Sequence, residues 1–241
     1  MKKRVHIGCA GWSVPAGAAE AFPREGSHLE RYAARFDCVE INSTFYRPHL
    51  VATYERWAAS VPARFRFSVK MPRAITHDAR LIGAGPLVRK FLAEAGHLGS
   101  KLGCVLVQLP PSLAFDRAIA KRFLQMMRRH YDGSLALEPR HASWFGPAAD
   151  AVLAELSTCR VQADPAIAVG EPAQRGIAYF RYHGSPRTYY SSYSTERLQD
   201  LAVRIAAGPG EVWCIFDNTA LGAATPNALA LRELIEASSA S

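Results

Sequence analysis

Two kinds of hydrophobic pattern alternate along this chain from its first residues to its last. The first is a short run of β-branched and aromatic residues, which is typical of a buried strand. The second is a longer segment with apolar residues at helical spacing and charge on one face, which is typical of a surface helix. The strand pattern occurs at residues 4–12, 38–46, 64–71, 102–109, 134–140, 160–164, 176–184 and 212–218. The helix pattern occurs at residues 29–36, 51–60, 87–98, 117–131, 148–157, 196–207 and 228–237.

The alternation predicts an α/β fold built on parallel strands, since each strand pattern is followed by a helix pattern. Eight such units in a chain of 241 residues predict a closed (β/α)8 barrel. We expect residues 1–241 to form a single TIM-like barrel domain. The sixth helix is expected to be short or missing, because the segment between Asp164 and Gly176 is brief and contains two prolines and a glycine.

Polar residues in the predicted strands share one parity, which places them on one face. Successive side chains on a strand point to opposite faces, so alternate residues line the inside of a barrel. Towards the strand ends this parity includes Glu40, Asn42, Ser68, Lys70, Gln108, Glu138, Arg140, Asp164, Arg181, His183 and Asp217. In barrels of this kind the active site lies at the carboxyl ends of the strands. The pattern therefore predicts a polar site at that rim.

Several sequence blocks carry a resemblance to a known family. They are IGCAGWS from residue 7, VEINSTFY from residue 39, ITH from residue 75, LPPS from residue 109, EPRHASW from residue 138, RYHG from residue 181 and FDNT from residue 216. With these blocks the chain resembles the YecE-like family, domain of unknown function 72, over nearly its whole length. The resemblance implies a TIM-like barrel with a polar pocket at the strand carboxyl ends, and it implies no assigned reaction. Two departures are Val14, where the family usually has Tyr, and Asp217, where many members have Asn.

Five residues of the predicted rim are candidate catalytic groups: Glu40, Lys70, Glu138, His141 and His183. A buried carboxylate such as Glu40 can act as an acid or base, and the alternative is a salt bridge for which Lys70 on the next strand is the expected partner. Lys70 can also form a Schiff base if burial and nearby cations lower its pKa. Glu138 and His183 are the main acid/base candidates.

The same rim carries candidates for binding a substrate. Arg140 and Arg181 are suited to an anion, because a guanidinium group binds a carboxylate or phosphate through two hydrogen bonds. With Glu138 and His183 they can instead form a purely structural ion network. A further anion-seeking feature is Thr225, which we expect to be the N-cap of the last helix. The other substrate-binding candidates are Trp12, Asn42, Trp144, Tyr189, Tyr190, Asp217 and Asn218.

A divalent metal is an alternative occupant of this rim. The donors that such ions use are present on Glu40, Glu138, His141, Asp164, His183 and Asp217. Lys70, Arg140 and Arg181 argue against a metal, because they neutralise the carboxylates that it needs. We therefore predict no metal ligands and no cofactor, and we keep a divalent metal as the alternative.

Composition, cysteine content and net charge bear on the class of protein, its location and its partners. The chain has 49% hydrophobic and 21% charged residues, which is typical of a globular protein, and no apolar run is long enough to cross a membrane. Five cysteines without a Cys-x-x-Cys pair predict reduced thiols and a cytoplasmic location. The net charge of +8 permits binding to nucleic acid or to an anionic metabolite and specifies neither. The oligomeric state stays open.

Three functions fit these observations. The one we favour is an enzyme that acts on a small anionic or phosphorylated polar compound by acid/base chemistry at the rim. The second is a metal-dependent phosphodiesterase or nuclease acting on nucleic acid, which the cations at the rim disfavour. The third is a non-catalytic protein that binds a ligand in the same pocket, because a fold does not fix a function.

Overall fold

The computed structural model describes residues 3–168 and 176–239 of the chain. Nine strands lie in these ranges, and all of their pairings are parallel. They are β1 (Arg4–Cys9), β2 (Cys38–Ile41), β3 (Arg66–Lys70), β4 (Leu102–Gln108), β5 (Ser134–Glu138), β6 (Thr158–Arg160), β7 (Gln162–Asp164), β8 (Ile177–Tyr182) and β9 (Glu211–Phe216). The prediction of an α/β fold with parallel strands is confirmed.

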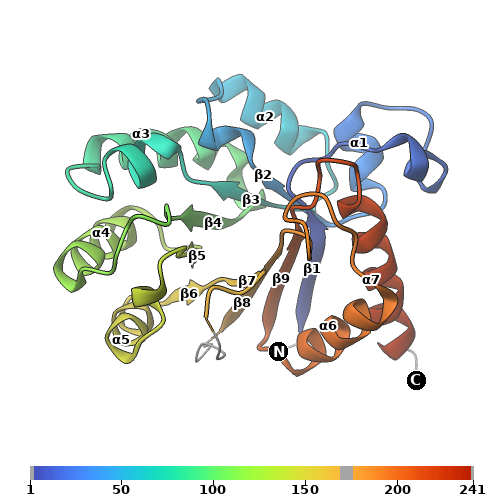
Figure 1. Ribbon diagram of the computed structural model, residues 1–241. Helices are drawn as coiled ribbons and strands as arrows, with labels where there is room; N and C mark the ends of the chain where they lie inside the picture. Colours follow the sequence, from blue (N-terminus) through green and yellow to red (C-terminus); the bar gives the residue numbers. More distant parts are fainter. Residues whose placement is uncertain (1–2, 169–175, 240–241) are drawn as a thin grey trace.

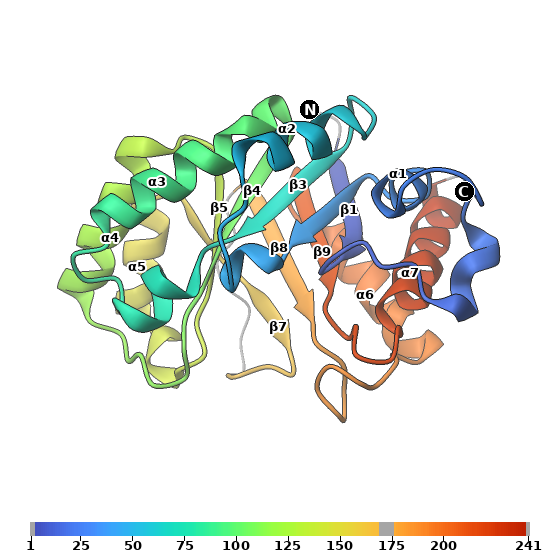
Figure 2. The same ribbon diagram turned by 90° about the horizontal axis from the view of Figure 1, so that it is seen from above.

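Helices follow the strands along the chain and lie around the outside of them (Figure 1). The α-helices are α1 (His28–Ala33), α2 (Val51–Ala59), α3 (Gly85–Ala95), α4 (Arg117–His130), α5 (Pro147–Glu155), α6 (Thr195–Ala207) and α7 (Ala224–Ser239). Short 3-10 or π turns are η1 (Ala16–Ala21), η2 (Ser43–Phe45), η3 (Ala74–Asp78), η4 (Gly96–Lys101) and η5 (Ala142–Trp144). Figure 2 shows α3, α4 and α5 on one side of the strands and α1, α6 and α7 on the other.

The strands divide into two parallel sheets rather than one continuous ladder. One sheet has the order β1-β9-β8-β7, and the other has the order β2-β3-β4-β5-β6. Between β1 and β2 the link is a single isolated bridge, Ala10 to Glu40, together with a hydrogen bond from Gly11 N to Glu40 O of 2.9 Å. The sequence predicts one closed eight-stranded barrel, whereas the described strands form two parallel sheets that adjoin each other, so closure into one barrel stays a prediction.

The strand predicted at residues 160–164 is two strands, β6 and β7, interrupted at Val161. Val161 N still donates to Leu137 O of β5 at 2.9 Å, whereas β7 pairs with β8. The chain therefore changes sheets at Val161, and a local hydrophobic pattern carries no sign of a change of partner. Of the segment where the sequence predicts a short or missing sixth helix, residues 169–175 lie outside the described residues.

Local chemistry explains several helix starts. Ser27 accepts a hydrogen bond from Glu30 N while Glu30 accepts one from Ser27 N, which is a capping box at the start of α1. Asp116 caps α4 in a similar way by accepting from Ile119 N. The prediction of Thr225 as the N-cap of the last helix is wrong. Because α7 begins at Ala224, Thr225 lies inside its first turn and its hydroxyl donates to Ser13 O instead.

The inner face of the strands is apolar along part of its length and charged at the carboxyl ends. One buried cluster of this face consists of Cys38, Cys104, Leu106, Ala136, Cys159, Val161, Ile177, Tyr179, Trp213 and Ile215. On β8 the same parity continues from Ile177 and Tyr179 to Arg181, and after β9 it continues to Asp217. The five cysteines are all buried and free. None of the described helices is long and apolar enough to cross a bilayer.

Candidate active site at the strand carboxyl ends

Arg181, on β8, lies at the centre of a buried ion network and has no exposed surface. Its Nε and Nη2 donate to the two carboxylate oxygens of Glu40 at 3.0 and 2.7 Å. Its Nη1 donates to Glu138 Oε2 at 2.7 Å, and Nη2 also donates to Asp217 Oδ2 at 3.0 Å. Glu40 and Glu138 belong to the five-stranded sheet, so one guanidinium group joins the two sheets at their carboxyl ends.

His183, just after β8, extends the network between two carboxylates and is also fully buried. Its Nδ1 lies 3.0 Å from Asp217 Oδ2, and its Nε2 lies 3.0 Å from Glu138 Oε1. Arg140 Nη2 lies 2.5 Å from that same Glu138 oxygen and 2.7 Å from His183 Nε2. The imidazole is therefore held on both of its nitrogen atoms.

The Nε2 atom of His183 faces two groups of opposite hydrogen-bonding character. A guanidinium group can donate hydrogen bonds and cannot accept them, so the 2.7 Å contact from Arg140 Nη2 favours a lone pair on Nε2. Glu138 Oε1 is an acceptor at 3.0 Å and favours a proton on the same atom. In either tautomer the ring lies between Asp217 on one side and Glu138 with Arg140 on the other.

The charges of the network keep its carboxyl groups ionised. Burial alone raises the pKa of Glu138, but Arg181, with His183 and Arg140 beside it, holds this pKa well below its ordinary value. Burial likewise opposes ionisation of Asp217, and Arg181, His183 and Lys70 lower the pKa of that group. In return the three carboxylates raise the pKa of Arg181 well above its ordinary value despite burial. At neutral pH Glu138 is thus a carboxylate without a proton to donate.

Lys70, at the end of β3, is placed differently from the sequence-based expectation. The prediction that it pairs with Glu40 is wrong, because Arg181 occupies both oxygens of that carboxylate. The Lys70 ammonium lies instead over the ring of Phe45, 4.4 Å from its centroid. Lys70 is 6% exposed, and burial followed by repulsion from Arg181 lowers its pKa, against the attraction of the carboxylates.

The site also contains Tyr179 and Ser68, and neither is a catalytic or binding candidate from the sequence. The Tyr179 hydroxyl lies 2.9 Å from Glu40 Oε2 and 2.8 Å from Ser68 Oγ, and both residues are fully buried. These contacts fix the side of Glu40 that Arg181 leaves open. An aromatic residue inside a strand is usually core, and the parity shared with Arg181 is the one signal that could have identified Tyr179.

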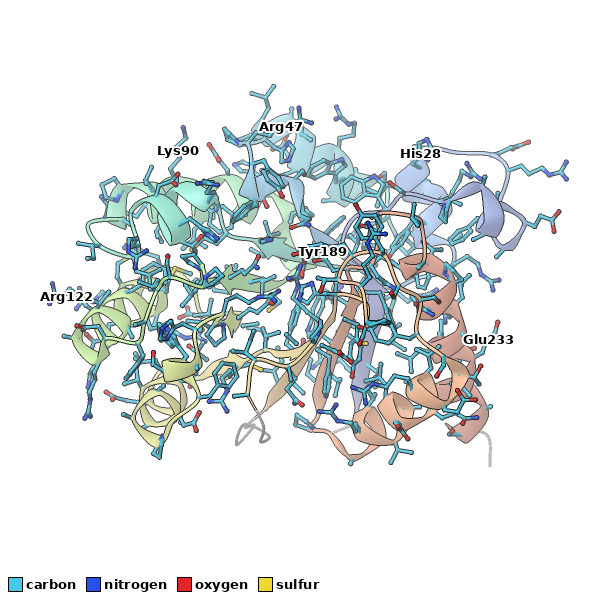
Figure 3. The ribbon with its side chains drawn as sticks, viewed as in Figure 1. His28, Arg47, Lys90, Arg122, Tyr189 and Glu233 are labelled. Carbon is cyan, nitrogen blue, oxygen red and sulfur yellow. The ribbon has the colours of Figure 1, made fainter. Side chains whose placement is uncertain are left out.

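Tyr189 lies against the network from the loop after β8. Its ring meets the His183 ring edge-on at 5.7 Å between centroids, its backbone N donates to His183 O, and its side chain is 43% exposed. Its φ of 70° is in the left-handed region, which a bulky residue adopts only when its surroundings hold it there. In Figure 3 Tyr189 lies near the middle of the view, whereas Lys90 and Arg122 project from outer helices.

Four other candidates make their contacts elsewhere. His141 bonds Ser143 Oγ at 2.8 Å. Trp144 is 1% exposed and donates from Nε1 to Leu113 O at 2.9 Å, which makes it core. Trp12 packs edge-on against Trp57 at 5.0 Å between centroids. Tyr190 carries the Arg187 guanidinium 3.9 Å above its ring.

Two asparagines complete the predicted set. Asn218 is fully buried and donates from Nδ2 to Ser191 O and to Asn227 Oδ1, each at 2.9 Å. Asn42, directly after β2, is half-buried. Asn42 Oδ1, Asn218 Oδ1 and Arg140 Nε are among the five buried side-chain atoms of the described residues that lack a hydrogen-bond partner; the other two are His6 Nδ1 and the Tyr131 hydroxyl. Unpaired buried polar atoms are rare in proteins, and a catalytic role or a bound water or ion is one explanation for them.

The donor set does not fit a divalent metal. Both oxygens of Glu40, both of Glu138 and Oδ2 of Asp217 face guanidinium or imidazole nitrogen. In residues 3–168 and 176–239, no three His, Cys, Asp or Glu side chains come together in a way that could hold a metal ion. The fourth carboxylate, Asp164, pairs with Arg197 at 2.8 Å.

Comparisons with known proteins identify the family and the fold of this chain. The UPF0759 protein YecE of Escherichia coli K12 is 35% identical over 145 residues, which covers 58% of this chain and 50% of that protein. This chain thus spans about half the length of that curated relative. A crystal structure of a DUF72 family protein from Thermotoga maritima superposes with a TM-score of 0.81 and 26% identity, over 97% of this chain and 99% of that one.

More distant structures share the fold alone. A D-allulose 3-epimerase from a Methylomonas species superposes with a TM-score of 0.55 and 15% identity, over 98% of this chain and 97% of that one. The family model described as a protein of unknown function, DUF72, matches residues 6–241, which is nearly the whole chain. The resemblance seen in the sequence blocks is therefore confirmed, and this chain belongs to the DUF72 family.

Proposed function

We propose that this protein is an enzyme that acts on a small anionic or phosphorylated polar compound at the carboxyl ends of its strands. The observation that carries the proposal is a buried, fully bonded network of Arg181, Glu40, Glu138, Asp217 and His183, with the unpaired ammonium of Lys70 beside it. Such a network holds charged groups rigidly in low dielectric, which is how active sites stabilise developing charge.

The burial of each group separates two roles within the site. Glu40, Glu138, Arg181 and His183 have no exposed surface, so they support and orient. Lys70 and Asp217 are each 6% exposed, and the Arg140 side chain is 14% exposed. Two of these three groups that reach solvent are cations, and the third shares its Oδ2 with Arg181 and His183. This arrangement favours an anion as the bound species.

The roles predicted from the sequence change accordingly. Glu138 and His183 become positioning residues: Glu138 orients Arg140 and Arg181, and His183 holds Asp217. Lys70 is the group that meets the substrate, with Asp217 as the carboxylate that accepts or returns a proton there. Residues 1–241 act as one TIM-like barrel domain in this proposal, with the two adjoining sheets forming its wall.

The first test measures anion binding through thermal stability. A ligand that binds only the folded state raises the melting temperature by mass action. We expect inorganic phosphate to raise the melting temperature more than chloride does at equal ionic strength. Lys70→Met is expected to abolish this difference, since the substitution removes the open cation and leaves a side chain of similar length.

Lys90→Met is the matched control, because Lys90 is an exposed lysine on α3 whose nearest carboxylate is Glu94 at 4.0 Å. It is expected to keep the wild-type response to phosphate. An equal phosphate response in wild type and Lys70→Met would contradict the proposed site. Turnover screening of phosphorylated and carboxylated polar compounds then separates an enzyme from a binding protein, since a binding protein retains the phosphate response and converts none of them.

A further inference from the structure

Lys70 differs from every other lysine that the structure describes. Lys3 donates to the carbonyls of Ala206 at 2.7 Å and Gly208 at 3.0 Å, and Lys101 donates to Val61 O at 2.6 Å. Lys90 and Lys121 lie 4.0 and 2.6 Å from the carboxylates of Glu94 and Glu155. In the described part of the chain, Lys70 alone has neither a hydrogen bond nor an ion pair on its Nζ, although it is the most buried of the five.

Contacts on both sides fix the backbone of Lys70. The lack of a hydrogen bond or ion pair on its Nζ is therefore not due to a loosely held strand end. The Thr44 hydroxyl lies 2.6 Å from Lys70 O and 2.9 Å from Ile41 O, which ties the end of β3 to the end of β2. On its other side Lys70 pairs in register with Leu106 of β4. The side chain then extends over the ring of Phe45. A lysine whose backbone is fixed and whose amine has no hydrogen-bond or ion-pair partner is positioned to act as a nucleophile.

The surrounding charges act on this amine from several elements. Arg181 on β8 disfavours its protonated form, while Glu40 on β2, Asp217 after β9 and Glu138 on β5 favour that form. Burial is the largest influence, and the net result is a lowered pKa for Lys70. The three carboxylates, whose oxygens are bonded to Arg181, counter burial and Arg181 only in part. The unprotonated form of the amine, which is the nucleophile, is therefore populated at a lower pH on Lys70 than on a solvent-exposed lysine.

We propose that Lys70 is a covalent catalyst that forms an imine with a small aldehyde or ketone carrying a carboxylate or phosphate group. This inference rests on the proposed function and names its substrate class. The anionic group of such a compound binds at the cationic rim near Arg140, while its carbonyl carbon faces Lys70 Nζ. A desolvated lysine amine is a recognised way to activate a carbonyl compound.

The proposed step balances without any further reactant. The lone pair of Nζ attacks the carbonyl carbon, and the carbonyl π electrons move to oxygen, which takes up one of the two amine protons. The carbinolamine then gives its remaining N–H proton to the hydroxyl group, which leaves as water while the nitrogen electrons form the C=N bond, so amine and carbonyl give imine and one water. Asp217 is the carboxylate of the network that reaches solvent, and it passes the proton between nitrogen and oxygen.

Trapping of the imine tests this proposal directly. The folded protein is incubated with glyoxylate or with dihydroxyacetone phosphate in the presence of sodium cyanoborohydride, which reduces an imine to a stable secondary amine. Trypsin cleaves after unmodified Lys70 and fails to cleave after the modified residue. We expect the label in an uncleaved peptide of residues 67–73, at one adduct per chain and with little label elsewhere.

The controls keep the outcome interpretable. Lys70→Met is expected to lose the adduct and Lys90→Met to retain it, with folding of both variants checked by circular dichroism. Label spread over Lys90, Lys101 and Lys121 with none at Lys70 would overturn the imine proposal. If that result occurred while Lys70→Met still lost the phosphate response, the anion site would stand and the covalent role alone would fall. If Lys70→Met kept both the adduct and the phosphate response, the covalent role and the anion site would both be contradicted.

Discussion

The two ends of the strands each bury a histidine between two carboxylates, and they build very different environments from the same residue types. His183, at the carboxyl end, has Glu138 and Asp217 at 3.0 Å from its two nitrogen atoms. His6, at the start of β1, has Asp37 and Glu211 at 3.9 Å each, and its Nδ1 has no hydrogen-bond partner. Both side chains are buried, at 0% and 7% exposure.

A guanidinium group explains the difference between the two ends. At the carboxyl end Arg181 and Arg140 are bonded to the carboxylates at 2.5 to 3.0 Å and draw them around His183. At the amino end burial, followed by repulsion from Arg66 and Arg4, lowers the pKa of His6 to about 4, and the ring packs against Trp213 at 4.5 Å. Buried charge becomes a rigid site only where each charge has a bonded partner. The amino end is therefore a packing feature.

Removing the central guanidinium should have the largest effect. Arg181→Met leaves Glu40, Glu138 and Asp217 buried without their shared partner and breaks one of the links between the two sheets. Loss of one partner of a buried ion network destabilises a protein by about 3–5 kcal/mol. Urea unfolding at neutral pH measures the change. Arg122→Met, on the exposed side of α4, should stay within about 0.5 kcal/mol of the wild type, and equal effects of the two variants would contradict the central role of Arg181.

His6 should impose a pH dependence that a phenylalanine removes. Its folded pKa of about 4 lies below the ordinary 6.5, so the unfolded chain binds the proton more tightly. The stability due to the neutral ring is complete above pH 6.5 and is lost as the pH falls towards 4, by about 3 kcal/mol. In His6→Phe, which retains a ring against Trp213, unfolding free energies at pH 7 and 4.5 should lie closer together than in the wild type. An unchanged difference would show that His6 is not the titrating group.

Glu138→Gln should have a smaller effect at neutral pH and a characteristic one in acid. We expect a loss of about 1–3 kcal/mol at pH 7, because the amide replaces a carboxylate that accepts from two arginines. The lowered pKa of Glu138 means that its stabilisation is present above its ordinary value of 4.5 and is lost as the pH falls through the folded value. Urea midpoints between pH 5 and 3 should therefore fall less steeply in the variant. A parallel fall in both proteins would place the acid sensitivity elsewhere.

Tyr189→Phe should have the smallest effect on stability, below about 0.5 kcal/mol, because the tyrosine side chain is 43% exposed. The ring contact with His183 is preserved in the variant. Thermal melts of the two proteins should nearly coincide. A large loss would mean that the Tyr189 hydroxyl has a structural role that its exposure does not indicate.

The alternation of side chains along strands explains what the sequence could predict of this site. The inward-facing positions of the strands include Glu40, Glu138, Arg181, His183 and Asp217. The structure brings all five together. The choice of partners could not be predicted, because Lys70 and Arg181 both carry a positive charge and only the three-dimensional placement decides which one reaches Glu40. His141 and Trp144 lie beyond the end of β5, where the alternation of strand residues no longer sets the direction of a side chain.

The fold shows the same division between local and non-local information. Residue patterns place the starts of the strands within two residues, for example β4 at Leu102–Gln108 against the predicted 102–109. The ends agree less well, since the strand predicted at residues 38–46 ends at Ile41. The division into two sheets depends on the change of partner at Val161 and on a single bridge at Ala10. Both features arise from contacts between distant parts of the chain, and a pattern within one strand does not contain them.

The most direct test of the account is the titration of Lys70 in the intact protein. Selective carbon-13 labelling of lysine allows the Cε signal of each lysine to be followed by NMR as the pH rises, with Lys70→Met identifying the signal of interest. We expect this signal to titrate below those of Lys90 and Lys121, since burial and Arg181 lower the pKa of Lys70. A Lys70 signal that titrates together with the exposed lysines would contradict the claim that this amine is the reactive group of the site.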